Sequence, residues 1–87
     1  MRISFLGPFA ELAGSELELA LPGSISLREL IAELAVRFPG FARYAALDSD
    51  HGLSAHVCFL RQGRPLKLAE RVQDQDQIQV LLPVTGG

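Results

Sequence analysis

Cysteine is almost absent from this chain of 87 residues, which contains only Cys58. An internal disulfide is therefore excluded, and so is a metal centre built on cysteines. An iron–sulfur domain, which takes about four cysteine ligands, is excluded for the same reason. We expect Cys58 to be a small buried apolar side chain, which is a common role of a free cysteine.

The chain also has no excess of positive charge. Its 8 Lys and Arg are outnumbered by 10 Asp and Glu, and the net charge is −2. Proteins that bind nucleic acids usually carry a strongly basic face, and no basic stripe interleaved with aromatic residues is found here. We therefore expect no nucleic-acid partner.

Long apolar runs are missing as well. No stretch approaches the roughly 20 consecutive apolar residues of a membrane helix, and the first residues, MRISFLG, are too short an apolar run to predict a signal peptide. We expect a cytoplasmic protein that does not contact a membrane. Apolar residues make up 48% of the chain and charged residues 21%, which predicts a folded domain. The length predicts a single domain with one small core and no room for a deep active site.

Alternating apolar residues predict several strands. In residues 2–6, RISFL, Ile3 and Phe5 lie on one face, and residues 16–21, ELELAL, alternate in the same way. Two such runs this close together indicate an antiparallel hairpin. Further strands are expected at 55–61 (AHVCFLR), near 66–68 and at 78–82 (IQVLL), with a turn at Gln62-Gly63.

One amphipathic helix is the clearest element of the sequence. Ser26 and Glu29 have the spacing of a capping box, in which each side chain accepts a hydrogen bond from a backbone amide at the helix start. Pro39-Gly40 ends the helix. Residues 40–54 and 69–77 show no clear periodicity and are expected to be connections. The apolar stripe of the helix consists of Leu27, Leu30, Ile31, Leu34 and Phe38.

The predicted order is two strands, one helix and then three strands, of which the middle one is short. A hairpin followed by a helix that crosses the sheet, and then by more strands, is the β-grasp arrangement. We therefore predict an α+β protein with a mixed sheet of about five strands and one main helix. The expected domain covers residues 1–82, and residues 83–87 are expected to form a flexible functional tail.

The same alternation predicts an apolar surface on the sheet. If Ile78, Val80 and Leu82 face the helix, the leucine between the last two faces outward. Outward leucines on neighbouring strands would form a patch of the kind that often marks a protein interface. A sheet covered on both faces is the alternative. The leucines expected to face outward are Leu6, Leu60 and Leu81.

Three stretches of the sequence carry a resemblance to a known family: ISFLGPFAELAG at 3–14, SLRELIAEL at 26–34 and DQDQIQVLLPVTGG at 74–87. Together they resemble the small sulfur-carrier subunit of molybdopterin synthase, in the β-grasp, ubiquitin-like family that also includes the thiamin sulfur carrier. The likeness runs over almost the whole chain. Three features depart from the family pattern: Gln75 replaces a turn glycine, Pro83 stands alone where two prolines are common, and the strand at 55–61 lacks an asparagine that is common there.

The resemblance implies a specific chemistry at Gly87. A partner similar to ubiquitin-activating enzymes transfers AMP from ATP to the carboxylate of this glycine, and a sulfur donor then replaces the adenylate to leave a thiocarboxylate. Inside the large subunit of molybdopterin synthase, the sulfur passes to a pterin precursor. The resemblance also implies that the small subunit holds no permanent cofactor, since ATP is used by the activating enzyme. It further implies that the small subunit is not catalytic by itself.

The residues at 83–87 suit this chemistry. Glycine has no Cβ and allows the closest approach of a backbone to a ligand or a channel wall. Gly86 and Gly87 would therefore form a segment narrow enough to enter a nucleotide site. Pro83 has no amide donor, and we expect the chain to leave the sheet there. The residues expected to contact partners are Leu6, Leu60, Leu81, Pro83, Val84 and Thr85.

Three other functions stay open on the sequence alone. A carrier for another pathway, such as thiazole formation, a variant molybdenum or tungsten cofactor, or tRNA thiolation, would use the same chemistry. A ubiquitin-like modifier would instead be joined through Gly87 to lysines, and Lys67, the only lysine here, would be the single site for building chains. A plain β-grasp binding module would make no use of the two final glycines.

The remaining polar groups are expected to be structural or solvated. DSDHG at 48–52 brings two carboxylates close to His51, but no second histidine has ligand spacing, so we expect a solvated loop and no metal. His56 is expected to be a structural residue on a strand. The basic stretch at 61–71 is expected to be a solvated face, with contact to an acidic partner surface as the alternative.

Overall fold

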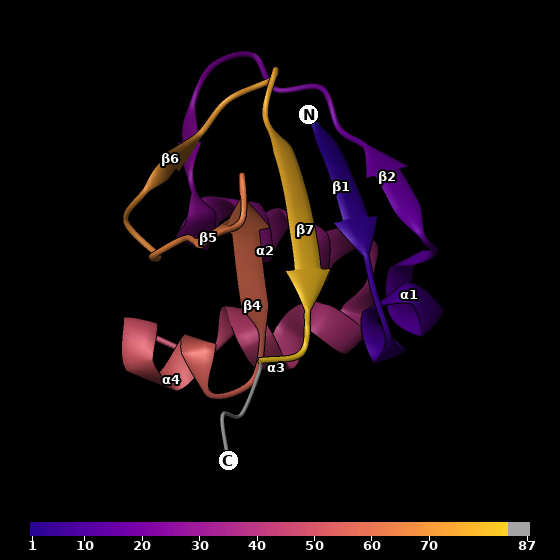
Figure 1. Ribbon diagram of the computed structural model, residues 1–87, viewed down its shortest axis with the longest axis vertical. Helices are drawn as coiled ribbons and strands as arrows, with labels where there is room; N and C mark the ends of the chain where they lie inside the picture. The colour runs from indigo at the N-terminus through magenta and orange to yellow at the C-terminus, as the bar shows by residue number, and fades with distance from the viewer. Residues whose placement is uncertain (84–87) are drawn as a thin grey trace.

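A mixed five-stranded sheet lies at the centre of the molecule, for which the computed structural model describes residues 1–83 (Figure 1). Its strands, in spatial order, are β2 (Glu16–Glu18), β1 (Arg2–Phe5), β7 (Gln77–Leu81), β4 (Cys58–Arg61) and β5 (Arg64–Pro65). The central neighbours β1 and β7 are parallel, and the other neighbours are antiparallel. The predicted mixed sheet is therefore confirmed.

The main helix, α2 (Leu27–Arg37), begins at the predicted capping box. The Ser26 hydroxyl accepts from the Glu29 amide at 3.1 Å, and the Glu29 carboxylate accepts from the Ser26 amide at 3.0 Å. These bonds satisfy amides that the start of a helix otherwise leaves unpaired. The helix crosses behind the sheet in Figure 1, which completes the α+β, β-grasp arrangement. The fully buried residues of its stripe are Leu27, Leu30, Ile31 and Leu34.

The core between the helix and the sheet is apolar, and no polar or charged side chain among the described residues is buried. A strand that slipped by one residue would expose its whole apolar set, so burial tests the predicted faces directly. The strand residues on the helix side are at most 3% exposed, which confirms the predicted faces for Ile3, Phe5, Phe59, Ile78 and Val80. Val57, which lies just before β4, is 1% exposed.

The connection at 40–54 is more ordered than the sequence predicts. It contains a 3-10 helix, η1 (Pro39–Phe41), and two short helices, α3 (Ala42–Ala45) and α4 (Asp50–Ser54). Phe41 is fully buried, and its ring centroid lies 5.7 Å from that of Phe5 and 6.0 Å from that of Phe9. The expected connection is therefore partly helical, which the sequence does not predict because helices of three to five residues are too short to show a periodic stripe.

Other short elements refine the prediction. The turn after β1 contains α1 (Pro8–Ala13). A second sheet pairs β3 (Ile25–Ser26) with β6 (Arg71–Val72) inside the expected connection 69–77. The short strand expected near 66–68 is β5, two residues earlier, because a two-residue turn pairs Arg61 with Arg64. Within residues 1–83, no helix is both long enough and apolar enough to cross a bilayer.

Candidate functional site: the end of β7 and the outer face of the sheet

The end of β7 is held from both sides. This strand lies between β1 and β4 (Figure 1), and Leu81 pairs with Cys58 on β4. On the other side, the Leu6 amide donates to the Val80 carbonyl at 2.9 Å. The point at which the chain leaves the sheet is therefore fixed by two neighbouring strands. The predicted tail residues Val84, Thr85, Gly86 and Gly87 lie outside the described residues.

The outward leucines lie on the sheet face opposite α2, which we call the outer face. Leu6 is 44% exposed, and Leu60 and Leu81 are half-buried. These three leucines, together with Cys58, form what we call the leucine patch. Pro83, also half-buried, follows shortly after the last residue of β7. The structure thus brings four of the predicted contact residues to one end of the outer face.

Leu82 corrects the sequence prediction. It was expected to face the helix with Ile78 and Val80, but its side chain is 53% exposed. The strand ends at Leu81, and the next residue but one, Pro83, has no amide with which to continue the ladder. Strand alternation therefore does not extend to Leu82. The proline after it was the sequence signal, and the exposed side chain adds apolar surface where the chain leaves the sheet.

Cys58 is half-buried rather than buried, and it lies across from Leu81 on the outer face. Partial burial raises the pKa of its thiol above the ordinary value for cysteine. The reactive form of cysteine is the thiolate, so a raised pKa disfavours nucleophilic chemistry at neutral pH. Cys58 is thus a part of the apolar surface, in keeping with its expected apolar role.

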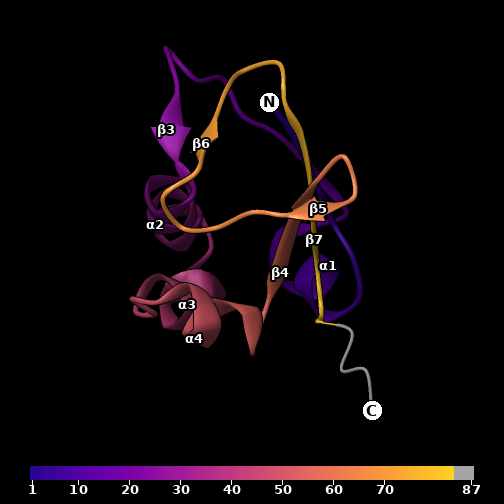
Figure 2. The same ribbon diagram turned by 60° about the vertical axis from the view of Figure 1, so that its left-hand side comes forward.

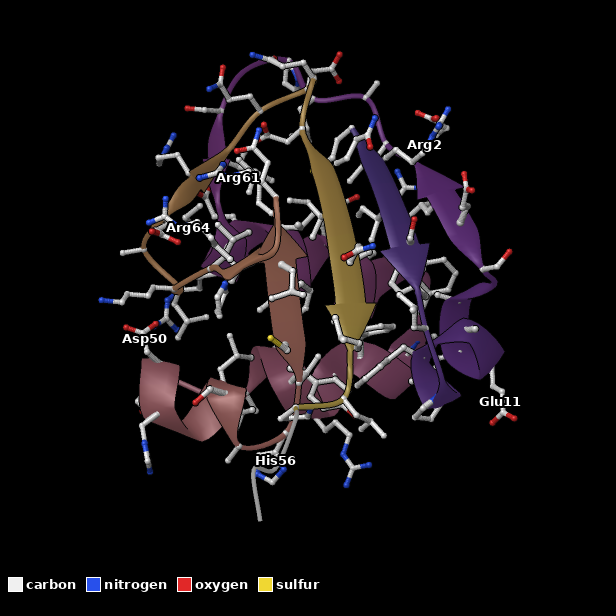
Figure 3. The ribbon with its side chains drawn as sticks, viewed as in Figure 1. Arg2, Glu11, Asp50, His56, Arg61 and Arg64 are labelled. Carbon is white, nitrogen blue, oxygen red and sulfur yellow. The ribbon has the colours of Figure 1, made fainter. Side chains whose placement is uncertain are left out.

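The basic stretch at 61–71 is not simply a solvated face. The Arg61 guanidinium donates to the Asp76 carboxylate at 3.0 Å and to the Arg71 carbonyl at 2.7 Å. Arg71 in turn donates to the Ser24 carbonyl at 2.8 Å. These bonds connect β4 with β6 and with the chain before β3. Figure 3 shows Arg61 and Arg64 on the same side of the molecule as β4 and β5.

The DSDHG segment also has a structural role. Ser49 caps α4, since its hydroxyl accepts from the Gly52 amide at 3.0 Å, and the Asp50 carboxylate accepts from the Leu68 amide at 2.7 Å. The expected solvation is confirmed, since Asp48, Ser49, Asp50 and His51 are exposed, but the expected loop is wrong because residues Asp50–Ser54 are helical. Within residues 1–83, no three His, Cys, Asp or Glu side chains are grouped so that they could hold a metal. His56 is exposed in the turn before β4 and not on a strand, as Figure 3 shows.

The ThiS family model matches residues 3–87 of the chain. None of the curated proteins matches it. Among solved structures, a Pyrococcus furiosus protein assigned as molybdopterin converting factor, subunit 1, is 28% identical with a TM-score of 0.79, and the match covers 95% of each chain.

Two further solved structures come from Haloferax volcanii. SAMP1 is 26% identical over 99% of this chain and 97% of its own, with a TM-score of 0.69. A structure of small archaeal modifier protein 1 is 25% identical with a TM-score of 0.70, and the match covers 95% of each chain. The chain belongs to the ThiS family, and its fold is the ubiquitin-like β-grasp found in sulfur carriers and small protein modifiers.

Proposed function

We propose that this protein is a sulfur carrier for molybdopterin synthesis and that the carboxylate of Gly87 is its reactive group. The observation that carries the proposal is the family match, which extends through residue 87 and so includes both glycines. The pathway is proposed from the likeness to the Pyrococcus furiosus protein assigned as molybdopterin converting factor, subunit 1, along 95% of both chains.

The proposed chemistry starts from a carboxylate, which is a poor electrophile. One oxygen of the Gly87 carboxylate attacks the α-phosphorus of ATP, and pyrophosphate leaves. A hydrosulfide equivalent from the sulfur donor then attacks the acyl carbon, AMP leaves, and a thiocarboxylate remains. This sulfur then displaces an oxygen substituent from a carbon of the pterin precursor, and hydrolysis of the acyl–sulfur bond regenerates the carboxylate. We assign these steps to partner enzymes, and ATP is bound by the activating adenylyltransferase.

The described domain would present the tail to those enzymes. Because β7 is paired on both sides, the position of Pro83 is set by the core and not by the tail itself. Pro83 fixes its own φ and donates no backbone hydrogen bond, so it directs the chain away from the ladder. Gly86 and Gly87 have no Cβ and suit a narrow channel that leads to a nucleotide.

We further propose that the leucine patch and Pro83 bind the activating adenylyltransferase and, in turn, the large subunit of molybdopterin synthase. Any enzyme that receives the residues after Pro83 must cover the end of β7. Leu6, Leu81 and Leu82 present apolar surface around that point. Burying such surface stabilises a complex by about 25 cal/mol for each Å² before the costs of association.

A ubiquitin-like modifier is the second candidate, and the two Haloferax volcanii structures favour it. It shares the adenylated Gly87 and differs only in the nucleophile, which is a lysine amine of a target protein instead of sulfur. A sulfur carrier for thiazole formation or tRNA thiolation is an alternative within the carrier class, because the family match does not distinguish the acceptor.

Deletion of the gene tests the proposed pathway. Loss of molybdoenzyme activity, restored by the wild-type gene but not by Gly87→Ala, is the expected result. A thiamin requirement or loss of thiolated tRNA with intact molybdoenzymes would contradict the molybdopterin assignment and favour another carrier pathway. The Gly87→Ala protein serves as the matched control, because it leaves residues 1–83 unchanged.

A further inference from the structure

A polar hollow of about 530 Å³ lies on the outer face, beside the leucine patch. Its floor is made by paired residues of β1 and β7, with Ser4 opposite Gln79 and Arg2 opposite Gln77. The β4–β5 turn forms one wall, and Figure 2 shows this turn projecting from the sheet on the side away from α2. Leu60 belongs both to the leucine patch and to the lining of the hollow.

The lining is rich in amides and has its charges paired. Arg61 is neutralised by Asp76 at 3.0 Å. Arg2 is neutralised by Glu18 at 3.0 Å and lies 3.5 Å from Glu16. An ionic ligand would therefore find little net charge to bind. Glutamine amides both donate and accept, which complements the N–H and C=O groups of a peptide backbone. The glutamines among the lining residues are Gln62, Gln75, Gln77 and Gln79.

The turn that forms the wall is conformationally unusual. Gln62 has a φ of 54°, and Gly63 follows with a φ of 76°. Two-residue hairpin turns with positive φ at both positions normally take Asn, Asp or Gly at the first one, because a longer side chain is disfavoured there. Strained backbone of this kind is often kept at functional sites. A glutamine is thus kept in this lining turn at a cost to the stability of the turn.

The leucine patch and the hollow are too close for a partner to cover only one of them. Leu60 of β4 pairs directly with Gln79 of β7, and Leu81 lies two residues after Gln79 on β7. A protein surface that rests on Leu60 and Leu81 therefore also covers the amide of Gln79. An amide that loses water without gaining a new hydrogen bond destabilises the complex. The partner must accordingly offer polar groups at this position.

We propose that the hollow receives an uncharged polar loop of the activating adenylyltransferase, which forms backbone hydrogen bonds with Gln62 and Gln79. This inference rests on the proposed function, since the enzyme is the one that adenylates Gly87. The leucine patch would supply apolar contact area, and the hydrogen bonds in the hollow would fix the orientation of the carrier on the enzyme. Hydrogen bonds at fixed positions determine how the carrier is rotated on the enzyme, and hence whether the residues after Pro83 are aimed at the nucleotide.

The test measures adenylation by ATP–pyrophosphate exchange, using the adenylyltransferase purified from the same organism. Gln62→Gly removes the side-chain amide, and glycine adopts the positive φ without strain. This variant should therefore unfold at a higher temperature than the wild type, yet its KM for the carrier should be about fivefold higher. That ratio corresponds to one net hydrogen bond. Gln62→Asn relieves the same strain but keeps an amide, so its KM should lie below that of Gln62→Gly. Because a carrier that is rotated on the enzyme presents Gly87 less often to the nucleotide, kcat should also fall for Gln62→Gly and should stay closer to the wild-type value for Gln62→Asn.

Gln79→Ala should raise KM by a similar factor, and the increase should be the same at low and high salt because the hollow is neutral. Ser54→Ala, on α4, is the surface control and should leave KM unchanged. Wild-type KM in both Gln62→Gly and Gln79→Ala would overturn the inference while leaving the proposed function intact. A wild-type chain that is never adenylated, by contrast, would overturn the proposed function and this inference together.

Discussion

Two neighbouring residues of β7 allow the stability of the fold and the binding of a partner enzyme to be tested separately. Val80 is fully buried beneath α2, whereas Leu81 is half-buried on the outer face. We expect Val80→Ala to destabilise the protein and Leu81→Ala to weaken adenylation. The two substitutions are adjacent in the sequence and opposite in direction, so each is the control for the other.

The magnitudes follow from burial. Val80→Ala removes two buried methyl groups, each worth about 0.8 kcal/mol by transfer, and leaves a cavity in a closely packed core. The free energy of unfolding should fall by about 2 kcal/mol, which corresponds to a Tm lower by roughly 10 °C for a domain of this size. Leu81→Ala removes a half-exposed side chain and should lower the free energy of unfolding by less than about 1 kcal/mol.

Function should show the reverse order. Leu81→Ala should raise the KM for the carrier in adenylation about tenfold, since a leucine buried in an interface contributes about 1–2 kcal/mol. Val80→Ala, assayed well below its Tm, should have a KM near that of the wild type. Thermal unfolding and ATP–pyrophosphate exchange measure the two effects on the same samples. A Leu81→Ala protein with unchanged KM, or one as unstable as Val80→Ala, would refute the assignment of the outer face to a partner.

Three further predictions concern the cap, its pH dependence and the tail. Ser26→Ala should lower the free energy of unfolding by about 1 kcal/mol in a denaturant titration, because it removes the cap of α2; an unchanged midpoint would contradict the capping role. Hydrogen bonds from the Ser26 backbone and side chain lower the pKa of Glu29. The ionised Glu29 therefore stabilises the folded protein fully above the ordinary glutamate pKa of about 4.3, and this contribution is lost as the pH falls through the lower folded-state pKa. Unfolding followed from pH 7 to acid should therefore show a smaller loss of stability in Glu29→Gln, and parallel curves would argue against the shift. Gly87→Ala should abolish adenylation without changing the Tm, and normal adenylation of this variant would count against the narrow-channel model.

The long strands and the main helix could be predicted because each is longer than the interval at which its apolar residues repeat. Two-residue alternation identified the buried faces of the long strands, and the Ser26–Glu29 spacing identified the start of α2. Register follows from alternation, because a slip of one residue exchanges the two faces. The outward positions of Leu6, Leu60 and Leu81 came from the same rule.

The remaining features depend on contacts that alternation does not encode. The pair of β3 and β6 joins Ile25 to Val72 through strands of two residues each, and neither strand is long enough to show a pattern. Leu82 lies beyond the point where the ladder stops. The polar hollow needs three strands and the positive φ of Gln62 together, so no single stretch of sequence predicts it. Short elements and composite surfaces are what the sequence leaves out.

The intact mass of the protein, purified from its own cells under mild conditions and without residues added after Gly87, tests the central claim most directly. The account predicts a fraction that is heavier by one oxygen-to-sulfur exchange, with the added mass localised to Gly87 by fragmentation. Gly87→Ala, purified in parallel, should lack this fraction. A chain found joined through Gly87 to lysines of other proteins, with no sulfur-containing form in fresh extracts, would contradict the carrier assignment and establish a modifier.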